Sequence, residues 1–278
     1  MALLILPFAA QAQDVSARGR LEPRNGVRRI AGPSDPVAVV RTLKVEEGDQ
    51  VRRGQTIAVM DVFEVREAAV LRIKADKVSQ AAVVARLTAE AENAEQEYAR
   101  ASQLSRDGVG STSETERWEN RRGAARAALL EASTRMASLD ASLRAAEGDL
   151  ARAVVKSPIA GEVLLVHARA GERVGPDGIA EIGETRAMYA RAEVYETDIP
   201  RVRVGQRAEI RSPALSGVLT GVVERVGAKV GRLTAAGADP AARNDARAIE
   251  VKIKLDDSAK AAALIDLEVE ILIFTRAR

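Results

Sequence analysis

The sequence predicts an elongated, mixed α and β fold. A long antiparallel α-helical coiled-coil hairpin is inserted into a split β-sandwich and followed by a small β-barrel. Three observations support this prediction. Residues 62–154 carry heptad spacing with one Gly/Ser break, similar short β motifs flank them, and residues 185–278 carry several short strand patterns. Aromatic residues make up only 3% of the chain, which suits coiled coils and small β modules packed with aliphatic side chains.

The hairpin is predicted from apolar residues that recur at alternating steps of three and four, the spacing of a heptad repeat. They are Val84, Leu87, Ala91, Ala94, Tyr98 and Ala101 in the first arm, and Ala125, Leu129, Ala132, Met136, Leu139, Leu143, Ala146, Leu150 and Ala153 in the second. Between the arms, residues 107–112 contain two glycines, and Ser111, Thr112 or Ser113 can cap the second helix. Arms of about 40 residues extend roughly 60 Å, so we expect a spacer or a reaching arm.

The β segments on either side of the hairpin are predicted to share one core. Residues 37–61 and 155–184 contain similar short strands separated by tight turns, where glycine accepts the positive φ that such turns need. The structural glycines of these turns are Gly48, Gly54, Gly161 and Gly171. Because neither segment is long enough to bury its own apolar face, we expect them to close one small sandwich, with the hairpin emerging between them.

The first residues predict export from the cytoplasm. Residues 1–12 hold a short apolar run that ends in Ala10-Gln11-Ala12, which fits a signal sequence cleaved before Gln13. The run is shorter than the roughly 20 residues that a membrane-spanning helix needs. A start site further upstream would allow a longer, uncleaved anchor, so both alternatives stay open. Residues 13–36 are rich in Gly and Pro and are predicted to be an extended, turn-rich segment.

The last part of the chain, residues 185–278, predicts a small β-barrel domain. Short strand patterns recur through this region, with one helical turn near residues 197–202. Residues 231–247 show no periodicity and are rich in Gly, Ala, Asp, Pro, Asn and Arg. We therefore expect a mobile loop between two of the barrel strands.

Composition and motifs exclude several classes of function. The 42 Lys and Arg residues nearly balance the 40 Asp and Glu residues and are dispersed among them, which argues against nucleic-acid binding. The absence of Cys excludes disulfides and thiolate metal sites. His167 is the only histidine, and the sequence has no phosphate-binding loop and no nucleophile elbow. We therefore expect no catalytic site, no metal, no cofactor and no enzymatic activity.

Split β motifs also occur in carrier domains, which bear biotin or lipoate on a lysine at an exposed turn. Here Met60-Asp61 occupies the corresponding turn and leads directly into the hairpin. Lys74 lies well inside the predicted helix, where a solvated charge explains it. The sequence therefore argues against a carrier function.

Three residues bracket the helical break and are the candidate functional residues: Arg100, Leu104 and Ser111. They fit an ordinary helix end, in which Arg100 is solvated, Leu104 closes the seam and Ser111 caps the second helix. They also fit a docking surface, in which an exposed leucine at the far tip inserts between the helices of a partner coiled coil. The spacing alone leaves both explanations open.

Taken together, these features resemble the HlyD-like periplasmic adaptors, or membrane fusion proteins, of bacterial tripartite exporters. Val45–Gln55 is similar to the first lipoyl half-motif of that family, and Val155–Val163 to the start of the second. Residues 194–206 are similar to the entry into the family's β-barrel. The resemblance covers almost the whole chain after the first residues and implies that the split sandwich is a lipoyl-like domain.

The resemblance also bears on the hairpin tip and on the branch of the family. Arg100, Leu104 and Ser111 match the tip pattern R-x3-L-x6-S, by which such adaptors dock on TolC-type channels. The match favours the docking explanation over the ordinary helix end. The stretch Gly19-Arg20-Leu21-Glu22-Pro23 is similar to the DevB-type branch, whose members serve ABC exporters.

These similarities imply a protein of the periplasm that is associated with the inner membrane. It would link an inner-membrane ABC transporter to a TolC-type outer-membrane channel, and several copies, six by the resemblance, would form a conduit for efflux or secretion. One alternative is an adaptor for a proton-driven pump or a protein secretion system. Another, from a different class, is a coiled-coil scaffold that carries no transport path.

Overall fold

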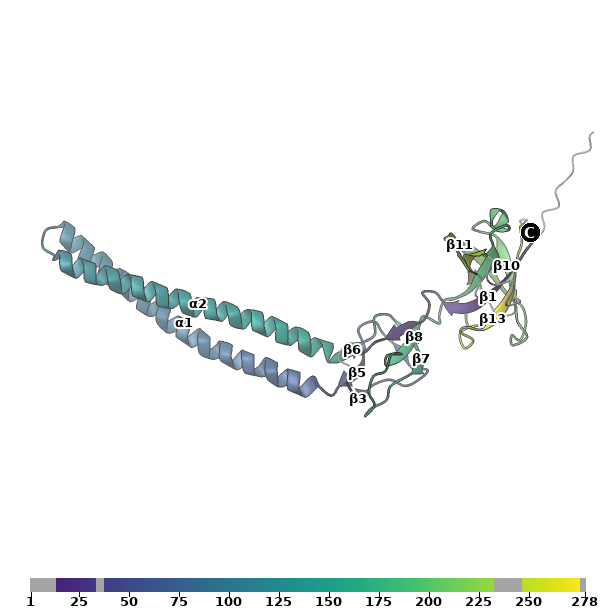
Figure 1. The fold of residues 1–278 in the computed structure, drawn as a ribbon, viewed down its shortest axis with the longest axis horizontal. Helices are drawn as coiled ribbons and strands as arrows, with labels where there is room; N and C mark the ends of the chain where they lie inside the picture. Colours follow the sequence, from purple (N-terminus) through teal and green to yellow (C-terminus); the bar gives the residue numbers. More distant parts are fainter. Residues whose placement is uncertain (1–13, 34–37, 233–246, 276–278) are drawn as a thin grey trace, which may run out of the picture.

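A computed structural model describes residues 14–33, 38–232 and 247–275. The molecule is elongated, with a helical hairpin at one end, a small β unit in the middle and a closed β-barrel at the other end (Figure 1). The predicted mixed α and β fold is confirmed. Within these ranges no helix combines the length and the apolar character that crossing a membrane requires. The predicted signal sequence, residues 1–12, lies outside the described residues.

The hairpin consists of α1 (Phe63–Arg106) and α2 (Thr112–Arg152), which contain 44 and 41 residues. At about 1.5 Å per residue, each arm is roughly 60–65 Å long. The apolar residues of the predicted seam lie at the contact between the two helices. Ala91, Ala94 and Ala132 are buried there, and every other seam residue is at least partly buried. Heptad spacing therefore identified the packing face of both arms.

Near the base of the hairpin the seam continues through polar residues. Lys77 of α1 forms an ion pair with Asp140 of α2. Gln80 is only 9% exposed, and its side-chain amide donates a 2.9 Å hydrogen bond to the backbone carbonyl of Ala132. A polar residue at a seam position fixes the stagger of two helices, because any other stagger leaves it buried without its partner.

Strands from both sides of the hairpin form one body, here called the central β unit. It contains two sheets, one with the order β2-β8-β7-β4 and the other with the order β3-β5-β6. The strands are β2 (Arg28–Ile30), β3 (Val40–Leu43), β4 (Gln50–Val51), β5 (Thr56–Met60), β6 (Val154–Lys156), β7 (Gly161–Val166) and β8 (Ala180–Gly183). β4 pairs with β7 and β5 pairs with β6, so each sheet joins a strand before the hairpin to one after it. Ile57, Met60, Val163 and Ile182 lie in the core that they share.

Four glycines shape the central β unit in two different ways. Gly48, Gly54 and Gly171 have φ values of +91°, +82° and +88°, a region that residues with a Cβ rarely adopt. Gly161 begins strand β7 instead. A Cβ at Gly161 would lie 2.4 Å from the carbonyl oxygen of Gly183, so this glycine permits the close approach of β8.

The closed barrel has the strand order β1-β13-β10-β11-β12-β9, with β1 pairing with β9 on its other side. Its strands are β1 (Val15–Pro23), β9 (Met188–Tyr195), β10 (Arg207–Arg211), β11 (Leu219–Arg232), β12 (Arg247–Leu255) and β13 (Glu268–Ile273). Alternate residues point inward and build an aliphatic core that includes Leu21, Met188, Ile210, Ile253 and Ile271. The predicted helical turn is a short 3₁₀ helix at Ile199–Arg201.

The N-terminal segment differs from the prediction that residues 13–36 are extended and turn-rich, outside a barrel made of residues 185–278. β1 is a strand of the barrel, hydrogen-bonded to β13 and β9, and β2 pairs with β8 in the central β unit. Val15, Ala17 and Leu21 of β1 are buried in the barrel. The segment thus contributes one strand to each body.

The predicted loop at residues 231–247 is shorter at both ends than expected. Residues 231 and 232 belong to β11, and residue 247 begins β12. The two strands continue their pairing up to Arg232 and Arg247. The remaining part of the predicted loop, residues 233–246, lies outside the described residues.

Candidate functional site

The turn between α1 and α2 forms the tip of the hairpin, far from both β bodies (Figure 1). The chain folds back over the end of α1, because the backbone N–H groups of Val109 and Gly110 both donate to the carbonyl of Leu104, at 3.1 and 2.9 Å. Gly108 has a φ of +75°. A Cβ at Gly110 would lie 2.7 Å from the backbone nitrogen of Ser105 and 2.9 Å from the carbonyl carbon of Leu104. Both glycines are therefore needed for so tight a turn.

This turn brings the three predicted residues to one place. Arg100, Leu104 and Ser111 all line a small cleft of about 60 Å³ beside the turn, together with Ala101 and Gly110. Leu104 is 46% exposed, although most leucines of the hairpin lie at the seam. Arg100 is 68% exposed and forms an ion pair with Glu97 at 3.1 Å. The three residues thus form one continuous surface at the extremity of the molecule.

Ser111 occupies the N-cap position of α2, one of the three candidates that the sequence offered. Its backbone carbonyl accepts hydrogen bonds from the N–H groups of Glu114 and Thr115, each at 3.2 Å. Its side chain makes no capping hydrogen bond. The hydroxyl group is therefore available to a partner, and the ordinary explanation of Ser111 as a side-chain cap does not describe its geometry.

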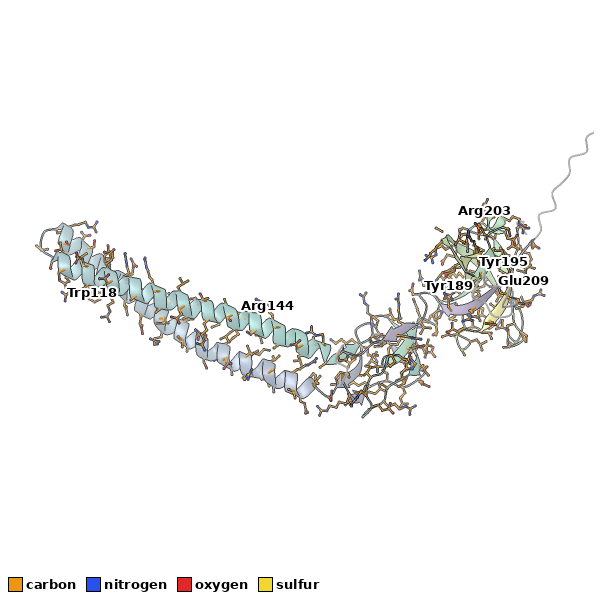
Figure 2. All side chains as sticks on the ribbon, in the orientation of Figure 1. Trp118, Arg144, Tyr189, Tyr195, Arg203 and Glu209 are labelled. Carbon is orange, nitrogen blue, oxygen red and sulfur yellow. The ribbon has the colours of Figure 1, made fainter. Side chains whose placement is uncertain are left out.

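Sequence reasoning missed one member of this surface, Trp118, the only tryptophan of the chain. It lies on α2 near the tip and lines the same cleft as Leu104 and Arg100 (Figure 2). The guanidinium carbon of Arg121 lies 5.8 Å from the centre of its ring, within reach of a cation–π contact. The neighbouring pair is closer, since the guanidinium of Arg122 lies 3.9 Å from the ring of Tyr98.

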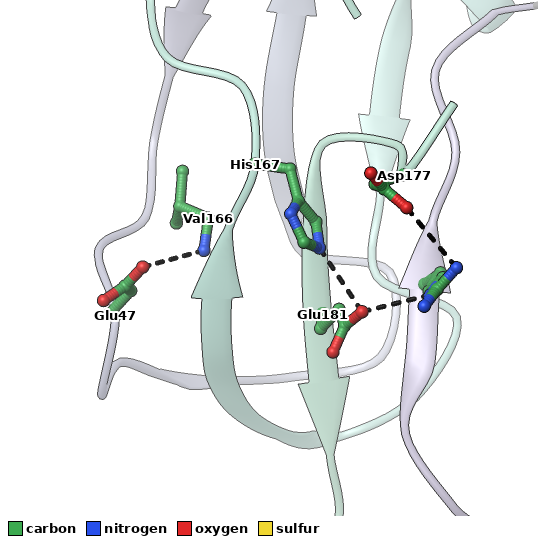
Figure 3. Close-up of polar contacts among 6 residues, drawn as sticks. Glu47, Val166, His167, Asp177 and Glu181 are labelled. Atoms are coloured by element: carbon green, nitrogen blue, oxygen red, sulfur yellow. Dashed lines mark hydrogen bonds and ion pairs between the residues drawn. The ribbon is translucent and has the colours of Figure 1, made fainter. Parts of the chain in front are cut away.

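The only histidine, His167, belongs to a polar network on the central β unit (Figure 3). Its Nε2 lies 3.3 Å from a carboxylate oxygen of Glu181, which also accepts a 3.1 Å hydrogen bond from Arg29. Arg29 in turn approaches Asp177 at 3.5 Å. This network joins β2 to β8 and to the turn that precedes β8. In the part of the chain that the structure describes, no group of three or more His, Asp or Glu side chains could hold a metal ion.

Two groups on the barrel have shifted pKa values with clear physical causes. Hydrogen bonds from Arg207, at 2.7 Å, and from Thr220, at 2.6 Å, lower the pKa of Asp256 below its ordinary value. Burial, followed by a hydrogen bond with Glu224, raises the pKa of Tyr189. Tyr189 is 2% exposed although it lies on an outward-facing position of β9. These contacts stabilise the barrel and bring no reactive group to its surface.

Comparison with known proteins identifies the fold. Neither sequence families nor curated proteins give a match. Among solved structures, MacA from Actinobacillus actinomycetemcomitans is similar with a TM-score of 0.72 and 20% identity, over 94% of this chain and 78% of MacA. The chain shares this fold. The membrane fusion protein Spr0693 from Streptococcus pneumoniae R6 is similar over 95% of this chain and 100% of its own, with a TM-score of 0.58 and 17% identity.

A third solved structure has a similar overall fold. It is a MacA–MexA chimeric protein that contains the α-hairpin domain of Pseudomonas aeruginosa MexA, and it covers 95% of this chain and 79% of its own. The TM-score is 0.61 and the identity 18%. These similarities extend over nearly the full length of the chain, so its hairpin, central β unit and barrel are parts of one known architecture.

Proposed function

We propose that this protein is a periplasmic adaptor of the HlyD-like type, which links an inner-membrane ABC transporter to a TolC-type outer-membrane channel. In this proposal residues 37–61 plus 155–184 form the lipoyl-like domain, and residues 62–154 form the reaching hairpin. The barrel would lie toward the transporter. The similarity to the membrane fusion protein Spr0693 supports the general role, and the sequence resemblance supports the choice of partners.

The observation that carries the proposal is the exposed tip at the end of a long arm. Each helix extends roughly 60 Å at about 1.5 Å per residue. At its end, Leu104 is 46% exposed and Val109 is 77% exposed, with no packing function to explain them. An apolar surface so far from any hydrophobic core is typical of a site that binds another protein.

At the tip, the three predicted residues have distinct roles in docking. Leu104 fills a groove between helices of the channel and contributes most of the apolar contact. Arg100 pairs with polar or acidic groups on the channel, which requires it to exchange its exposed partner Glu97. Ser111 donates its free hydroxyl to a backbone carbonyl near the turn.

Self-association into a ring is supported by a second apolar stripe on each helix. On α1 the stripe contains Val65, Leu71 and Val78, which are 61–74% exposed, with exposed alanines between them. On α2 it contains Leu130, which is 69% exposed, with exposed small residues before and after it. The full stripes are Val65, Ala68, Leu71, Ala75, Val78, Ala82, Ala85 and Ala89 on α1, and Gly123, Ala127, Leu130, Thr134, Ala137 and Ala141 on α2.

The placement of these stripes favours hairpins packed side by side. Stripe residues follow seam residues by five positions, which corresponds to a rotation of about 140–155° around the helix axis. The stripe therefore lies on the outer face of its arm, away from the other helix. Within one hairpin, Lys74 of α1 pairs with Glu147 of α2, so the two stripes run at the same height along the arms. The larger side chains on α1 of one copy can therefore pack against the small ones on α2 of the next. Such a contact between unlike surfaces repeats around a ring, and the family resemblance gives six copies.

Docking is tested by the variant Leu104→Asp, which places a charge in the centre of the proposed contact. We expect it to abolish export by cells that produce normal amounts of the protein, because burying an unpaired carboxylate prevents tight binding. Gln103→Asp is the matched control, since it adds the same charge one position away and outside the cleft. Export that persists in the Leu104→Asp strain would show that the tip does not dock.

The ring is tested by disulfide trapping, which is clean because the natural chain has no cysteine. A double variant with Val78→Cys and Ala137→Cys places one thiol on each outer face at similar heights. The two thiols of one hairpin point away from each other, so a disulfide can form only between copies. We expect a ladder of cross-linked species that ends at the closed ring, and only monomers when either cysteine is absent. A double variant that stays monomeric under oxidation would exclude this packing.

Export measurements in the same cells also distinguish this proposal from the alternative functions. Loss of the partner ABC transporter abolishes export if the proposal is correct, whereas an adaptor of a proton-driven pump loses function when the proton gradient is collapsed. A non-transport scaffold leaves export unchanged when its gene is deleted.

A further inference from the structure

We infer that one broad face of the hairpin lines the inside of the ring, and that it is the face on which ion pairs connect the two helices. The inference rests on the ring of the proposed function, because only a closed ring has an inside. It goes further by assigning the residues that the transported molecule meets. They form one row on each helix, between the seam and the stripe, here called the inner rows. The inner rows are Glu67, Lys74, Ala81, Thr88, Glu95 and Ser102 on α1, and Glu119, Arg126, Ser133, Asp140 and Glu147 on α2.

The first argument is the angle between the two contact faces of each helix. The stripe lies about 140–155° around the helix from the seam, so the two faces are not diametrically opposite. In a closed ring, each helix contacts its two neighbours through faces that make an angle below 180° toward the centre of the ring. For twelve helices, two from each of six copies, this angle is about 150°, and the range above corresponds to about five to seven copies. The side with the smaller angle is therefore the side that faces the inside.

The inner rows lie within this smaller angle. An inner-row residue follows a seam residue by four positions, as Thr88 follows Val84 and Ser133 follows Leu129. Four positions correspond to a rotation of about 40–50°, in the same sense as the five-position rotation that leads to the stripe. The row therefore lies between the two contact faces on the side where they approach each other.

The second argument is that both helices place this smaller angle on the same side of the hairpin. The ammonium nitrogen of Lys74 on α1 lies 3.3 Å from a carboxylate oxygen of Glu147 on α2. A guanidinium nitrogen of Arg126 on α2 lies 2.5 Å from a carboxylate oxygen of Glu95 on α1. All four residues belong to the inner rows, so the two rows lie beside each other. Each contact between copies therefore turns the wall in the same direction, which closes a ring and does not extend a flat layer.

The inner rows give the ring a hydrophilic inner wall of nearly balanced charge. Lys77 and Arg122 of the seam add two positive charges, because they pair with Asp140 and Glu95 of the inner rows. Each copy then contributes five acidic and four basic side chains to the wall. Ala81 is the one apolar residue of the inner rows. A water-soluble molecule thus meets paired charges and hydroxyl groups, and an apolar molecule finds no surface on which to adsorb.

The opposite face of the hairpin has a different arrangement of charges. Ion pairs there stay within one helix, as between Arg86 and Glu90 on α1 and between Arg152 and Asp149 on α2. This face also carries Val83, which is 37% exposed. Among the residues that the structure describes, every side-chain ion pair between α1 and α2 involves the inner rows. The two broad faces are therefore distinct, and a ring can expose only one of them to its interior.

The test uses the full-length protein locked as a ring by the disulfide between Val78→Cys and Ala137→Cys. One further cysteine is added, either Thr88→Cys in the inner row of α1 or Asn93→Cys as the matched control on the opposite face. Asn93 follows Thr88 by five residues, so the two thiols point in nearly opposite directions. Both positions are ten or more residues, roughly 15 Å or more, from Val78 along α1, which is too far to join the disulfide lock. The free thiol is labelled with a short biotin maleimide, and streptavidin is then added.

The readout is the capture of closed rings by streptavidin. Twelve helices spaced about 8–10 Å apart enclose a channel roughly 20–30 Å wide, which admits the biotin maleimide and excludes a streptavidin tetramer. We expect mass spectrometry to show biotin on both variants. Closed rings with Asn93→Cys should bind streptavidin. Closed rings with Thr88→Cys should bind it only after the lock is reduced and the ring dissociates.

The outcomes separate this inference from the proposed ring. Capture of Thr88→Cys rings together with loss of capture of Asn93→Cys rings would show that the opposite face lines the inside, so the inference is wrong and the ring stands. Equal capture of both variants as closed rings would also overturn the inference, because neither face would then be enclosed. If the Val78→Cys and Ala137→Cys protein forms no closed ring, the proposed ring is wrong, and the inference is wrong with it.

Discussion

Replacing Gly161 by alanine tests how the two halves of the central β unit meet. The new Cβ would lie 2.4 Å from the carbonyl oxygen of Gly183 and 2.9 Å from its carbonyl carbon. Both are backbone atoms of a paired strand, so β7 and β8 must separate to accommodate the methyl group. Overpacking of this kind costs about 1–3 kcal/mol, and the reduced flexibility of the unfolded chain offsets about 0.4–1 kcal/mol. We expect a net loss of about 1–2 kcal/mol.

Gly148→Ala on α2 provides the matched control, because the chemical change is the same and the surroundings differ. The nearest atom to a Cβ at Gly148 is a guanidinium nitrogen of Arg152 at 3.9 Å, an ordinary contact. Alanine is favoured over glycine inside a helix by about 0.8–1 kcal/mol. The same substitution should therefore stabilise the hairpin and destabilise the central β unit.

The assay is native-state hydrogen exchange read by mass spectrometry, because an elongated molecule with separate bodies does not unfold in one step. For Gly161→Ala, amide protection in peptides that cover β7 and β8 should fall about 5- to 30-fold, the equivalent of about 1–2 kcal/mol. For Gly148→Ala, amide protection in peptides from the C-terminal part of α2 should rise. Unchanged protection in β7 and β8 of Gly161→Ala would refute the close approach of the two strands.

Two further substitutions and one titration test other contacts of the structure. Gln80→Ala removes the buried hydrogen bond to Ala132 and should destabilise the hairpin by about 1 kcal/mol, measured by thermal unfolding at 222 nm. Because the pKa of Asp256 is lowered in the folded barrel, its ion pair with Arg207 contributes stability that is present above the unfolded value of 3.8 and is lost as the pH falls. Asp256→Asn should be less stable than wild type at neutral pH, and the two curves should converge in acid. Tyr189 should ionise above the ordinary tyrosine value of 10.0 in a spectrophotometric titration, and a normal titration would show that the residue is not buried.

The spacing of apolar residues along the chain predicted the two helices of the hairpin correctly, because the packing of each helix depends on one apolar face of its own. The seam that begins at Val84 was found because every position in it is apolar. The helix was predicted down to its base, but the seam was not followed below Val84, because Lys77 and Gln80 occupy seam positions there. Their partners, Asp140 and Ala132, lie on the other helix, and a single sequence does not show that two distant residues satisfy each other.

The strand at the start of the chain illustrates a second limit. Val15, Ala17 and Leu21 alternate with polar residues, which is the period of a strand. Gly19 between them favoured the prediction of a turn-rich segment. In the structure this glycine faces the barrel core, where a Cβ would lie 2.3 Å from the carbonyl oxygen of Arg191. Arg191 lies more than 170 residues away in the sequence, so the need for glycine at this position becomes clear only when the barrel is closed.

The composition of the tip surface depends on the register between the two helices. Leu104 and Ser111 lie on either side of the turn between the two helices, so their spacing in the sequence was enough to find them. Trp118 joins them only because the alignment of α2 with α1 places its ring beside Ala101. A shift of α2 by one half-heptad would move the ring away from the cleft. Gln80 helps to fix that alignment roughly 30–35 Å from the tip, at about 1.5 Å per residue. If the alignment governs docking, Gln80→Leu should keep the hairpin helical by circular dichroism and still reduce export by cells that produce normal amounts of the protein, whereas unchanged export would show that the turn alone sets the tip.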